Sequence, residues 1–453
     1  MRKQIHLGID DIDSPGGGCT THFAALLVER LSTLGSVWTD YPNLIRLNPN
    51  IPFRTRGNGA IALRFILKEQ NLIQIKPLLE SMIEDYVDLT YPNTNPGAML
   101  IEGKPSARIL DFANRALWRT IPIEIGKRLI HEEQCEHISY GNGRGLVGAL
   151  AAVGNLLNGD YTFEYIAYRK IQNSGKMRGV SNDSVLMMDK AMGDKTFSNI
   201  DGKTGLGLIA PHGPDPVLFG IRGEQPQDVI KAASYIKSKQ DIDRWMVFRT
   251  NQGTGAHLTN CVYIADLRPY MAAVVHGVVD SAPRIIEGGH VIFGVEDCSG
   301  RIDCAAYEPT GNFREIILNL IKGDQVLIHV GVRPAAKTHG LTLNVEGIEI
   351  LKAAEKLKLT NPICPRCAKR MKSAGSGKGY KCFNCGFKDP KGKKITILSR
   401  RNIEKRLYLP PPRAQRHLTR PMSRLNQSNE GEQTSLIYQW HSHMTGNDQT
   451  ESN

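Results

Sequence analysis

The segment HLGIDDIDSPGGGCTTHFAALLVERL, residues 6–31, decides how the chain begins. Residues 4–9 alternate polar and apolar side chains, which predicts a β-strand, and residues 21–34 carry apolar side chains at helical spacing. The loop between them places three carboxylates, Asp10, Asp11 and Asp13, within four positions and ahead of three glycines. Like charges this close repel each other unless a cation lies among them. The segment therefore predicts a strand-to-helix loop that holds a positive ion.

The composition of this loop favours Mg²⁺ together with a phosphorylated ligand. Carboxylate oxygens are the ligands that Mg²⁺ prefers when it also binds phosphates. The glycines let the backbone approach a ligand closely, and a helix that begins near Thr20 offers free N–H groups to an anion. The alternative is an ordinary helix cap, in which Asp13 or Ser14 forms a turn. The chain lacks G-x-x-x-x-G-K-[ST], which excludes a P-loop NTPase.

Outward from this loop the chain predicts a multidomain α+β protein. Residues 1–125 indicate an α/β catalytic domain, and strands and helices continue to alternate over 126–280, with the partition between these two domains left open. Over 285–355, five strands and one inserted helix indicate an OB-fold β-barrel, which commonly binds single-stranded nucleic acid; another small β-barrel is the alternative. Residues 391–421 form a basic segment, and the polar residues 422–453 are predicted to be a disordered tail.

Two cysteine pairs over residues 360–390 predict a zinc ribbon. CPRC and CFNC supply four thiolates, from Cys364, Cys367, Cys382 and Cys385. Thiolates suit tetrahedral Zn²⁺, and four of them leave no open position for catalysis, so the predicted role is structural. The alternative is a chance occurrence of the spacing.

The overall charge favours a polyanionic partner. Lys and Arg total 57 against 45 for Asp and Glu, a formal net charge of +12. This excess favours nucleic acid over an acidic small molecule. No apolar run approaches the roughly 20 residues of a membrane span, and no secretion signal opens the chain, so we expect a cytoplasmic protein without a membrane partner. We infer no obligate protein partner.

Several stretches resemble one known family, the archaeal tRNA(Ile) 2-agmatinylcytidine synthetases. Besides GIDDIDSPGGGCTT, they are LIRLNPNIPFRTRGNGAIAL, GRGLVGALAAVGN, PHGPDPVLFGIRG, RTNQGTGAH and YLPPPRAQRHL, and together they cover about residues 1–421. The resemblance implies a kinase-like catalytic domain, a ferredoxin-like domain, an OB-fold and a zinc ribbon.

The resemblance also implies a reaction. The family joins agmatine to C2 of the wobble cytidine in the CAU anticodon of a minor isoleucine tRNA, so that AUA is decoded. ATP phosphorylates the C2 carbonyl oxygen, the amine of agmatine attacks C2, and phosphate leaves; the products include AMP. By the resemblance, Asp10, Asp11 and Asp13 coordinate Mg²⁺ and ATP, and Thr20 is the threonine that becomes phosphorylated. From the residues alone, the interpretation of Thr20 as an ordinary N-cap hydroxyl is favoured.

Further candidates follow from residue chemistry. The candidate nucleotide-binding residues are Gly17, Gly18, Arg54, Arg56 and Arg144. Basic and glycine-rich loops suit polyphosphate, although a solvated turn explains them as well.

For the substrates, His212 and Asp215 lie in a Pro/Gly-rich loop suited to cationic agmatine, with a structural turn as the alternative. Arg333 and Lys337 are candidates for holding tRNA phosphates, with solvated surface charges as the alternative. Relatives carry an acidic residue where this chain has Gly255 and Ala256, so we expect no agmatine contact from that loop.

Two rival functions remain. The first is a non-catalytic nucleic-acid-binding protein, because an OB-fold and a zinc ribbon also serve binding alone. The second is a ligase of the same architecture that uses a different amine.

Overall fold

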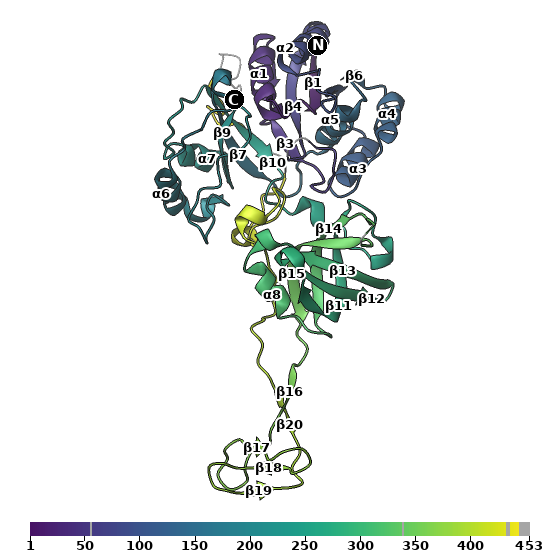
Figure 1. Cartoon of the computed structure of the whole chain (residues 1–453). Coiled ribbons are helices and arrows are strands. Elements are labelled where there is room, and N and C mark those ends of the chain that lie inside the picture. Colours follow the sequence, from purple (N-terminus) through teal and green to yellow (C-terminus); the bar gives the residue numbers. More distant parts are fainter. Residues whose placement is uncertain (55–56, 338, 432–434, 444–453) are drawn as a thin grey trace.

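The computed structural model describes residues 1–54, 57–337, 339–431 and 435–443. Figure 1 shows a large sheet with its helices, a barrel next to it, and a small ribbon at the far end of a two-stranded stalk. Among the described residues no helix has the length and apolar character needed to cross a membrane.

The largest unit is a ten-stranded sheet with the order β6-β5-β1-β4-β3-β10-β7-β9-β8, with β2 paired to β4. Its strands are β1 (Arg2–Asp10), β2 (Val37–Trp38), β3 (Asn43–Arg46), β4 (Gly59–Lys68), β5 (Gly97–Glu102), β6 (Glu136–Ser139), β7 (Thr162–Tyr168), β8 (Thr196–Phe197), β9 (Val217–Gly223) and β10 (Arg244–Thr250). Within the described part of this sheet, only the short contact between β3 and β10 is parallel, and it joins a first half, β1 to β6, to a second half, β7 to β10. The sheet is therefore continuous across the two halves.

In the described part of the chain, the helices that accompany this sheet are α1 (Thr20–Thr33), α2 (Ile75–Tyr86), α3 (Ala107–Ala116), α4 (Ile123–Glu132), α5 (Arg144–Gly154), α6 (Asn182–Met192) and α7 (Pro226–Ala233). Helices α3 and α4 pack on α5, and α6 packs on α7. Helix α5 packs directly on β1, because a Cβ added to Gly8 would lie 2.2 Å from the carbonyl oxygen of Ala149. The position between residues 125 and 126, where the sequence left the partition between two domains open, lies inside α4, and the chain returns to the first half through β6 and α5.

The five-stranded barrel comprises β11 (Ala272–Ile285), β12 (Val291–Asp297), β13 (Gly300–Ala306), β14 (Gln325–Arg333) and β15 (Thr342–Lys352), with α8 (Phe313–Leu318) inserted. Pairing of β13 with β15 closes it. The predicted five-strand barrel is confirmed, but it begins at residue 272 and not at 285. The run at the start of β11 is almost continuously apolar, so it lacks the alternation that marks a half-exposed strand.

Beyond the barrel, β16 (Leu357–Thr360) and β20 (Ile395–Leu398) pair to form the stalk. The ribbon at its end contains β17 (Lys372–Ser373), β18 (Tyr380–Lys381) and β19 (Lys388–Asp389). The chain then returns: β21 (Leu407–Tyr408) pairs with β15, and the yellow part of the trace in Figure 1 runs back to the large sheet. We call residues 399–443 the return segment.

The return segment corrects the prediction of a disordered tail over 422–453. Trp440 is fully buried and packs edge-on against Trp38 and Tyr41, with ring centroids 5.9 and 6.1 Å apart. Its carbonyl accepts the N–H of Val247 at 2.9 Å. Strand β3 covers only one end of β10, and residues around Trp440 pair with the edge that β3 leaves open. Residues 422–431 and 435–443 are thus ordered parts of the fold, and residues 444–453 lie outside the described residues.

Candidate active site and zinc centre

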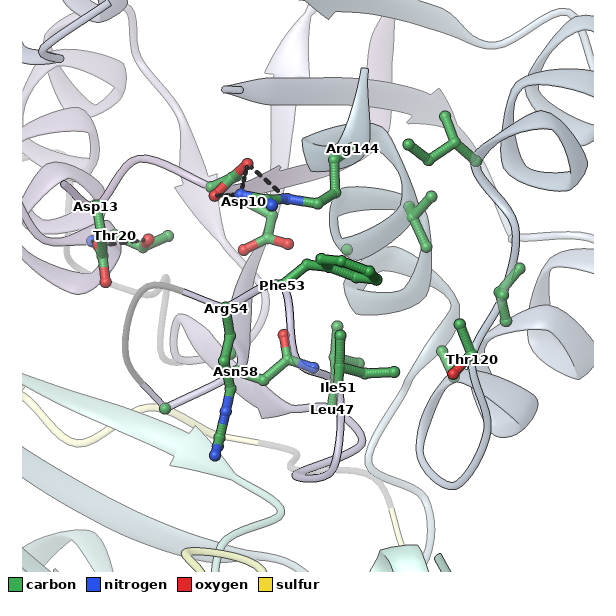
Figure 2. Close-up of a pocket in the computed structure, with 18 of the residues that line it drawn as sticks. Asp10, Asp13, Thr20, Leu47, Ile51, Phe53, Arg54, Asn58, Thr120 and Arg144 are labelled. Atoms are coloured by element: carbon green, nitrogen blue, oxygen red, sulfur yellow. Dashed lines mark hydrogen bonds and ion pairs between the residues drawn. The ribbon is translucent and has the colours of Figure 1, made fainter. Parts of the chain in front are cut away.

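A cavity of about 270 Å³ lies where the loop after β1, the start of α1 and the start of α5 meet. Its wall includes six residues singled out from the sequence, namely Asp10, Asp11, Asp13, Thr20, Arg54 and Arg144 (Figure 2). We call this cavity the acidic pocket.

Asp10 ends β1 and faces α5 at a glycine. A Cβ on Gly148 would lie 1.7 Å from a carboxylate oxygen of Asp10, so only glycine leaves room for this side chain. Burial, and then the charge of Asp11, raise the pKa of Asp10 well above its ordinary value. Ionised Asp10 is therefore costly here unless a cation neutralises it.

Asp11 is held by Arg144 at the start of α5. Its backbone takes the left-handed conformation, with φ of 61°. The Arg144 guanidinium donates to the carboxylate at 2.8–3.1 Å, and the N–H of Asn95 donates to it at 3.0 Å. Burial raises the pKa of Asp11 although Arg144 acts in the opposite direction. Arg144 thus lines the acidic pocket while already bonded to a carboxylate.

Asp13 caps α1 through Thr20. The Asp13 carboxylate accepts the backbone N–H of Thr20 at 2.6 Å and its hydroxyl at 3.0 Å. The capping alternative is therefore part of the structure. The cap also fixes the Thr20 hydroxyl at the edge of the acidic pocket, beside a carboxylate that can accept its proton.

The predicted nucleotide-binding residues have different positions. Gly17 and Gly18 belong to the turn that closes between Ser14 and Gly17, and neither is among the residues that line the acidic pocket. Arg54 lines the pocket, but Figure 2 shows its guanidinium extending away from Asp10 and Asp13. Arg56 lies outside the described residues.

The predicted substrate residues are not brought to this pocket. Asp215 is buried, and its carboxylate accepts from Arg178 at 3.0 Å and from the N–H of Val217 at 3.1 Å. His212 lies in the same loop. Arg333 and Lys337 are exposed on the barrel, where Arg333 donates to the hydroxyl of Tyr307.

Apolar residues form a wall of the pocket that sequence reasoning missed. Leu47, Ile51 and Phe53 follow β3, and Ile121 and Pro122 lie in the connection from α3 to α4. Phe53 is 64% exposed. The only sequence signal was an aromatic residue within a polar and proline-containing loop, and that signal is weak.

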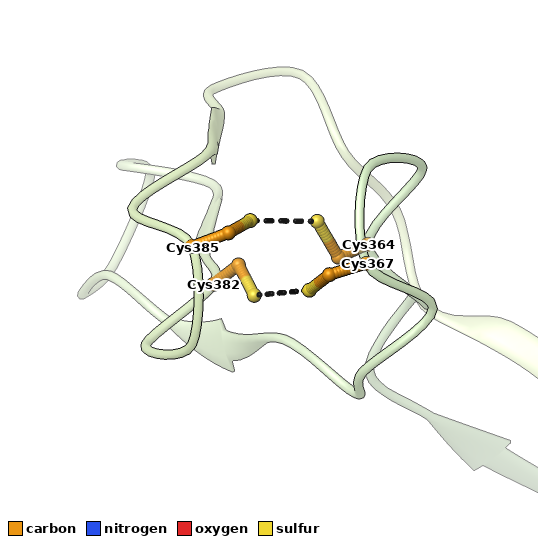
Figure 3. Close-up of side chains that lie close together, drawn as sticks. All are labelled: Cys364, Cys367, Cys382 and Cys385. Atoms are coloured by element: carbon orange, nitrogen blue, oxygen red, sulfur yellow. Dashed lines mark hydrogen bonds between the residues drawn. The ribbon is translucent and has the colours of Figure 1, made fainter.

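The four cysteines of the ribbon converge (Figure 3). The sulfur atoms of Cys364 and Cys385 lie 3.5 Å apart, those of Cys367 and Cys382 lie 3.4 Å apart, and all four fall within 4.8 Å of one another. Zn–S bonds of about 2.3 Å in a tetrahedron place sulfurs roughly 3.8 Å apart, so the four thiolates fit zinc. The predicted ribbon is confirmed.

Family models match three parts of this chain: the TiaS TCKD domain over residues 6–77, the TiaS FLD domain over 143–257 and the TiaS C-terminal zinc ribbon domain over 361–403. The chain is 43% identical to TiaS of Methanosarcina acetivorans, an isoleucine-tRNA 2-agmatinylcytidine synthetase, over 93% of this chain and 98% of that protein. It is 42% identical to the TiaS of Staphylothermus marinus, over 93% of each.

Solved structures agree over nearly the whole length. The crystal structure of apo TiaS, an isoleucine-tRNA agmatidine synthetase, matches with a TM-score of 0.84 at 36% identity, covering 95% of this chain and 99% of that one. The crystal structure of the complex of TiaS with its isoleucine tRNA, AMPCPP and agmatine matches with a TM-score of 0.81 at 34% identity and the same coverage. With such identity over almost all of its residues, the chain belongs to the TiaS family of isoleucine-tRNA 2-agmatinylcytidine synthetases.

Proposed function

We propose that this protein is an ATP-dependent ligase that joins agmatine to C2 of the wobble cytidine in the CAU anticodon of an isoleucine tRNA, and that the acidic pocket performs its phosphoryl transfer. Relatives of this activity match 93% of the chain, and solved TiaS complexes contain isoleucine tRNA, ATP or its analogue, and agmatine. The observation that carries the site assignment is the Thr20 hydroxyl held 3.0 Å from Asp13, next to Asp10 and Asp11.

The carboxylates provide the charge that nucleotide chemistry needs. Asp10, Asp11 and Asp13 would hold Mg²⁺, and the raised pKa values of Asp10 and Asp11 are those of carboxylates that lack enough positive charge. Bound there, Mg²⁺ would neutralise phosphate oxygens during transfer. When the Thr20 oxygen bonds to a phosphorus of ATP, the P–O bond to the rest of the nucleotide breaks, the nucleotide leaves, and Asp13 accepts the hydroxyl proton of Thr20. Exposed Phe53 offers a face on which a base can stack.

The ligation itself replaces one bond at C2 of cytosine by another. Phosphorylation of the C2 oxygen converts a poor leaving group into phosphate. The primary amine of agmatine then forms the C–N bond, the C–O bond breaks, and the oxygen departs with phosphate while the amine loses a proton to a base. An anticodon loop is single-stranded, so extruding the base costs only a few kcal/mol.

Other assignments complete the proposal. The first half of the sheet corresponds to the kinase-like unit, the second half to the ferredoxin-like unit, and the barrel to an OB-fold. Gly17, Gly18 and Arg56 stay predictions for the nucleotide, and Arg333 and Lys337 for the tRNA. His212 and Asp215 stay predictions for agmatine, whose cation would have to compete with Arg178 for Asp215. The proposed location is the cytoplasm.

One experiment separates the rival functions. Isoleucine tRNA with a CAU anticodon is incubated with the protein, MgATP and agmatine, spermidine or lysine, and the nucleosides are analysed by mass spectrometry. We expect agmatinylcytidine with agmatine alone. A product with another amine would identify a different ligase. If the protein neither forms a product nor consumes ATP, it is a binding protein.

A matched pair of variants tests the site. Asp11→Ala should abolish ATP consumption and modification while tRNA binding survives, because it removes a pocket carboxylate. Asp111→Ala, which removes an exposed aspartate paired with Arg115 on α3, should leave both activities intact. Full activity of Asp11→Ala would refute the assignment of the pocket.

A further inference from the structure

A second group of charged side chains lies between the two halves of the sheet. It comprises Arg46 at the end of β3, Arg54 after it, Arg222 on β9, and Arg416 and His417 on the return segment. A Cβ added to Gly57 would lie 3.1 Å from the ring of His417 and 3.3 Å from a guanidinium nitrogen of Arg46, so these two side chains lie side by side. The charges of Arg222, Arg54 and Arg416 also act on His417. We call this group the basic recess.

Few of these cations are paired with an acidic side chain in the part of the chain that the structure describes. Arg46 donates through one terminal nitrogen to the carbonyl of Gly57 at 3.0 Å, while its buried Nε has no hydrogen-bond partner among the residues that the structure describes. Among the described residues the Arg222 side chain forms no hydrogen bond or ion pair, and its guanidinium lies 5.9 Å from the centre of the Phe197 ring. The acid that acts on Arg222 is Glu164, its cross-strand neighbour on β7, which already accepts a hydrogen bond from Gln252.

The pKa of His417 indicates that several positive charges act at this solvent-exposed position. His417 is exposed to solvent, and the charge of Arg46 first, together with the charges of Arg222, Arg54 and Arg416, holds its pKa well below the ordinary value. Burial lowers the pKa of both Arg46 and Arg222. Desolvated cations without counter-charge destabilise a fold, unless a ligand supplies the missing charge.

The basic recess adjoins the acidic pocket. Arg54 belongs to both, and Asp13 is among the acids that act on Arg46. We propose that the basic recess binds a phosphate group of a substrate and holds it beside Thr20, through Arg46 and Arg222. The source is the tRNA backbone next to the reactive cytidine or the terminal phosphate of ATP. Planar guanidinium groups suit phosphate oxygens because they donate in pairs. This inference rests on the proposed function.

The test uses Arg222→Gln, which removes a cation that forms no ion pair within the described part of the chain. Arg222→Lys keeps the charge but loses the paired donors, and Arg2→Gln, at the opposite end of β1 from Asp10, is the matched control. For each full-length protein, the affinity for unmodified isoleucine tRNA is measured against salt concentration, the affinity for MgATP is measured by calorimetry, and Tm is measured without substrate.

If the phosphate belongs to tRNA, Arg222→Gln weakens tRNA binding by at least about fivefold, lowers the slope of log K against log salt by about 1, and leaves ATP binding unchanged. If the phosphate belongs to ATP, Arg222→Gln weakens MgATP binding and leaves tRNA binding and its salt dependence unchanged. In either case the affinity of Arg222→Lys lies between those of the wild type and of Arg222→Gln, and the Tm of neither variant falls.

Two results would overturn the inference. One is tRNA and ATP affinities within about twofold of Arg2→Gln. The other is a Tm several degrees lower for Arg222→Gln, which would make this arginine structural. These outcomes are distinct from failure of the proposed function, in which the wild-type protein binds both ligands but forms no agmatinylcytidine.

Discussion

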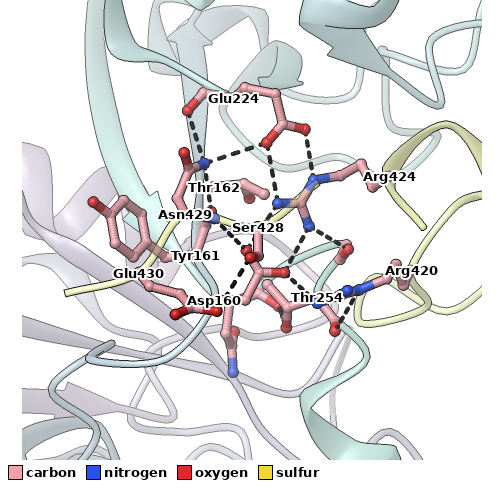
Figure 4. A network of polar contacts seen from close by, with 12 residues as sticks. Asp160, Tyr161, Thr162, Glu224, Thr254, Arg420, Arg424, Ser428, Asn429 and Glu430 are labelled. Atoms are coloured by element: carbon pink, nitrogen blue, oxygen red, sulfur yellow. Dashed lines mark hydrogen bonds and ion pairs between the residues drawn. The ribbon is translucent and has the colours of Figure 1, made fainter. Parts of the chain in front are cut away.

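The network around Arg424 and the catalytic region both gather arginines and carboxylates from distant parts of the chain, but the network around Arg424 pairs both of its arginines, Arg420 and Arg424, with carboxylates. Arg424 is almost completely buried, and it donates to Glu224 at 2.6 Å and to Asp160 at 2.9 Å (Figure 4). Arg420 donates to the other oxygen of Asp160 at 2.6 Å. Burial acts to lower the pKa of Arg424, yet its bonds to Glu224 and Asp160 raise it.

The acidic pocket and the basic recess show the opposite pattern. Asp10 lies among other carboxylates, and its pKa is raised. Arg222 lies among other cations, and its pKa is lowered. The same side-chain types thus hold the fold together in one region and oppose it in the other. The pKa of each of these groups is shifted so that its charged form is disfavoured, and the groups lie next to a cavity. Such shifts indicate a site where a ligand supplies the opposite charge.

The zinc ribbon is a third group of like charges, and removing its metal should have the largest effect on stability. Its four thiolates are like charges that need a cation, and structural zinc contributes about 10–16 kcal/mol in small metal-folded units. Removing zinc with a chelator should unfold residues 361–403 while the sheet and barrel stay folded. Hydrogen exchange measures this region by region.

Loss of zinc should also weaken tRNA binding without changing the affinity for ATP. Cys261→Ser, which alters an exposed cysteine outside the ligand set, is the control and should behave as wild type. Protection of the ribbon that survives zinc removal would show that the metal does not fold it.

Arg424→Gln tests the paired region. Leaving Asp160 and Glu224 buried without their shared cation should lower the free energy of unfolding by about 3–5 kcal/mol. Urea denaturation measures the change, with Arg2→Gln as the control. Substrate affinity of the folded fraction should not change. A loss below about 1 kcal/mol would place this network among weak surface ion pairs.

Thr20→Val tests the unpaired region with a smaller energy. Without the hydroxyl, modification should fall by about 100-fold or more, equivalent to about 2.7 kcal/mol, and Thr20→Ser should restore it. Stability should change by less than about 1 kcal/mol, because the N–H of residue 20 still caps α1 through Asp13. An active Thr20→Val protein would reduce this hydroxyl to a cap.

The smallest effect concerns pH. The pKa of Asp10 in the folded protein exceeds its unfolded value near 3.8, so its contribution to stability is present below pH 3.8 and is lost as pH rises through the raised pKa. Stabilisation by Mg²⁺ should therefore be larger at pH 8 than at pH 5, which calorimetry measures. Buried His6 and His22, with pKa values of about 4, destabilise the fold below pH 6.5 with or without Mg²⁺, so their effect cancels. Equal stabilisation at both pH values would contradict the role of Asp10.

Local patterns explain why parts of this molecule are readable from sequence. The strand, acidic loop and helix of residues 2–33 are contiguous, and so are the two cysteine pairs, so their periodicity and spacing carry the information. The barrel was recognisable from alternating strands, except for its first strand, whose apolar run does not alternate.

The remaining features depend on contacts between distant residues. Trp440 looks like an isolated aromatic in a polar tail until Trp38 and Tyr41 are placed beside it. Asp215 looks free for a cation until Arg178 is found bonded to it. Nothing local to β3 or β9 indicates that Arg46 and Arg222 share one recess.

The stability of Asp10→Asn with and without MgATP tests most directly whether unmatched charge in this molecule is reserved for ligands. The amide removes the buried negative charge, so the variant without nucleotide should have a Tm equal to or above that of the wild type. MgATP should raise the Tm of the wild-type protein and leave that of the variant unchanged. A variant that is less stable without nucleotide, and is still stabilised by MgATP, would contradict the account.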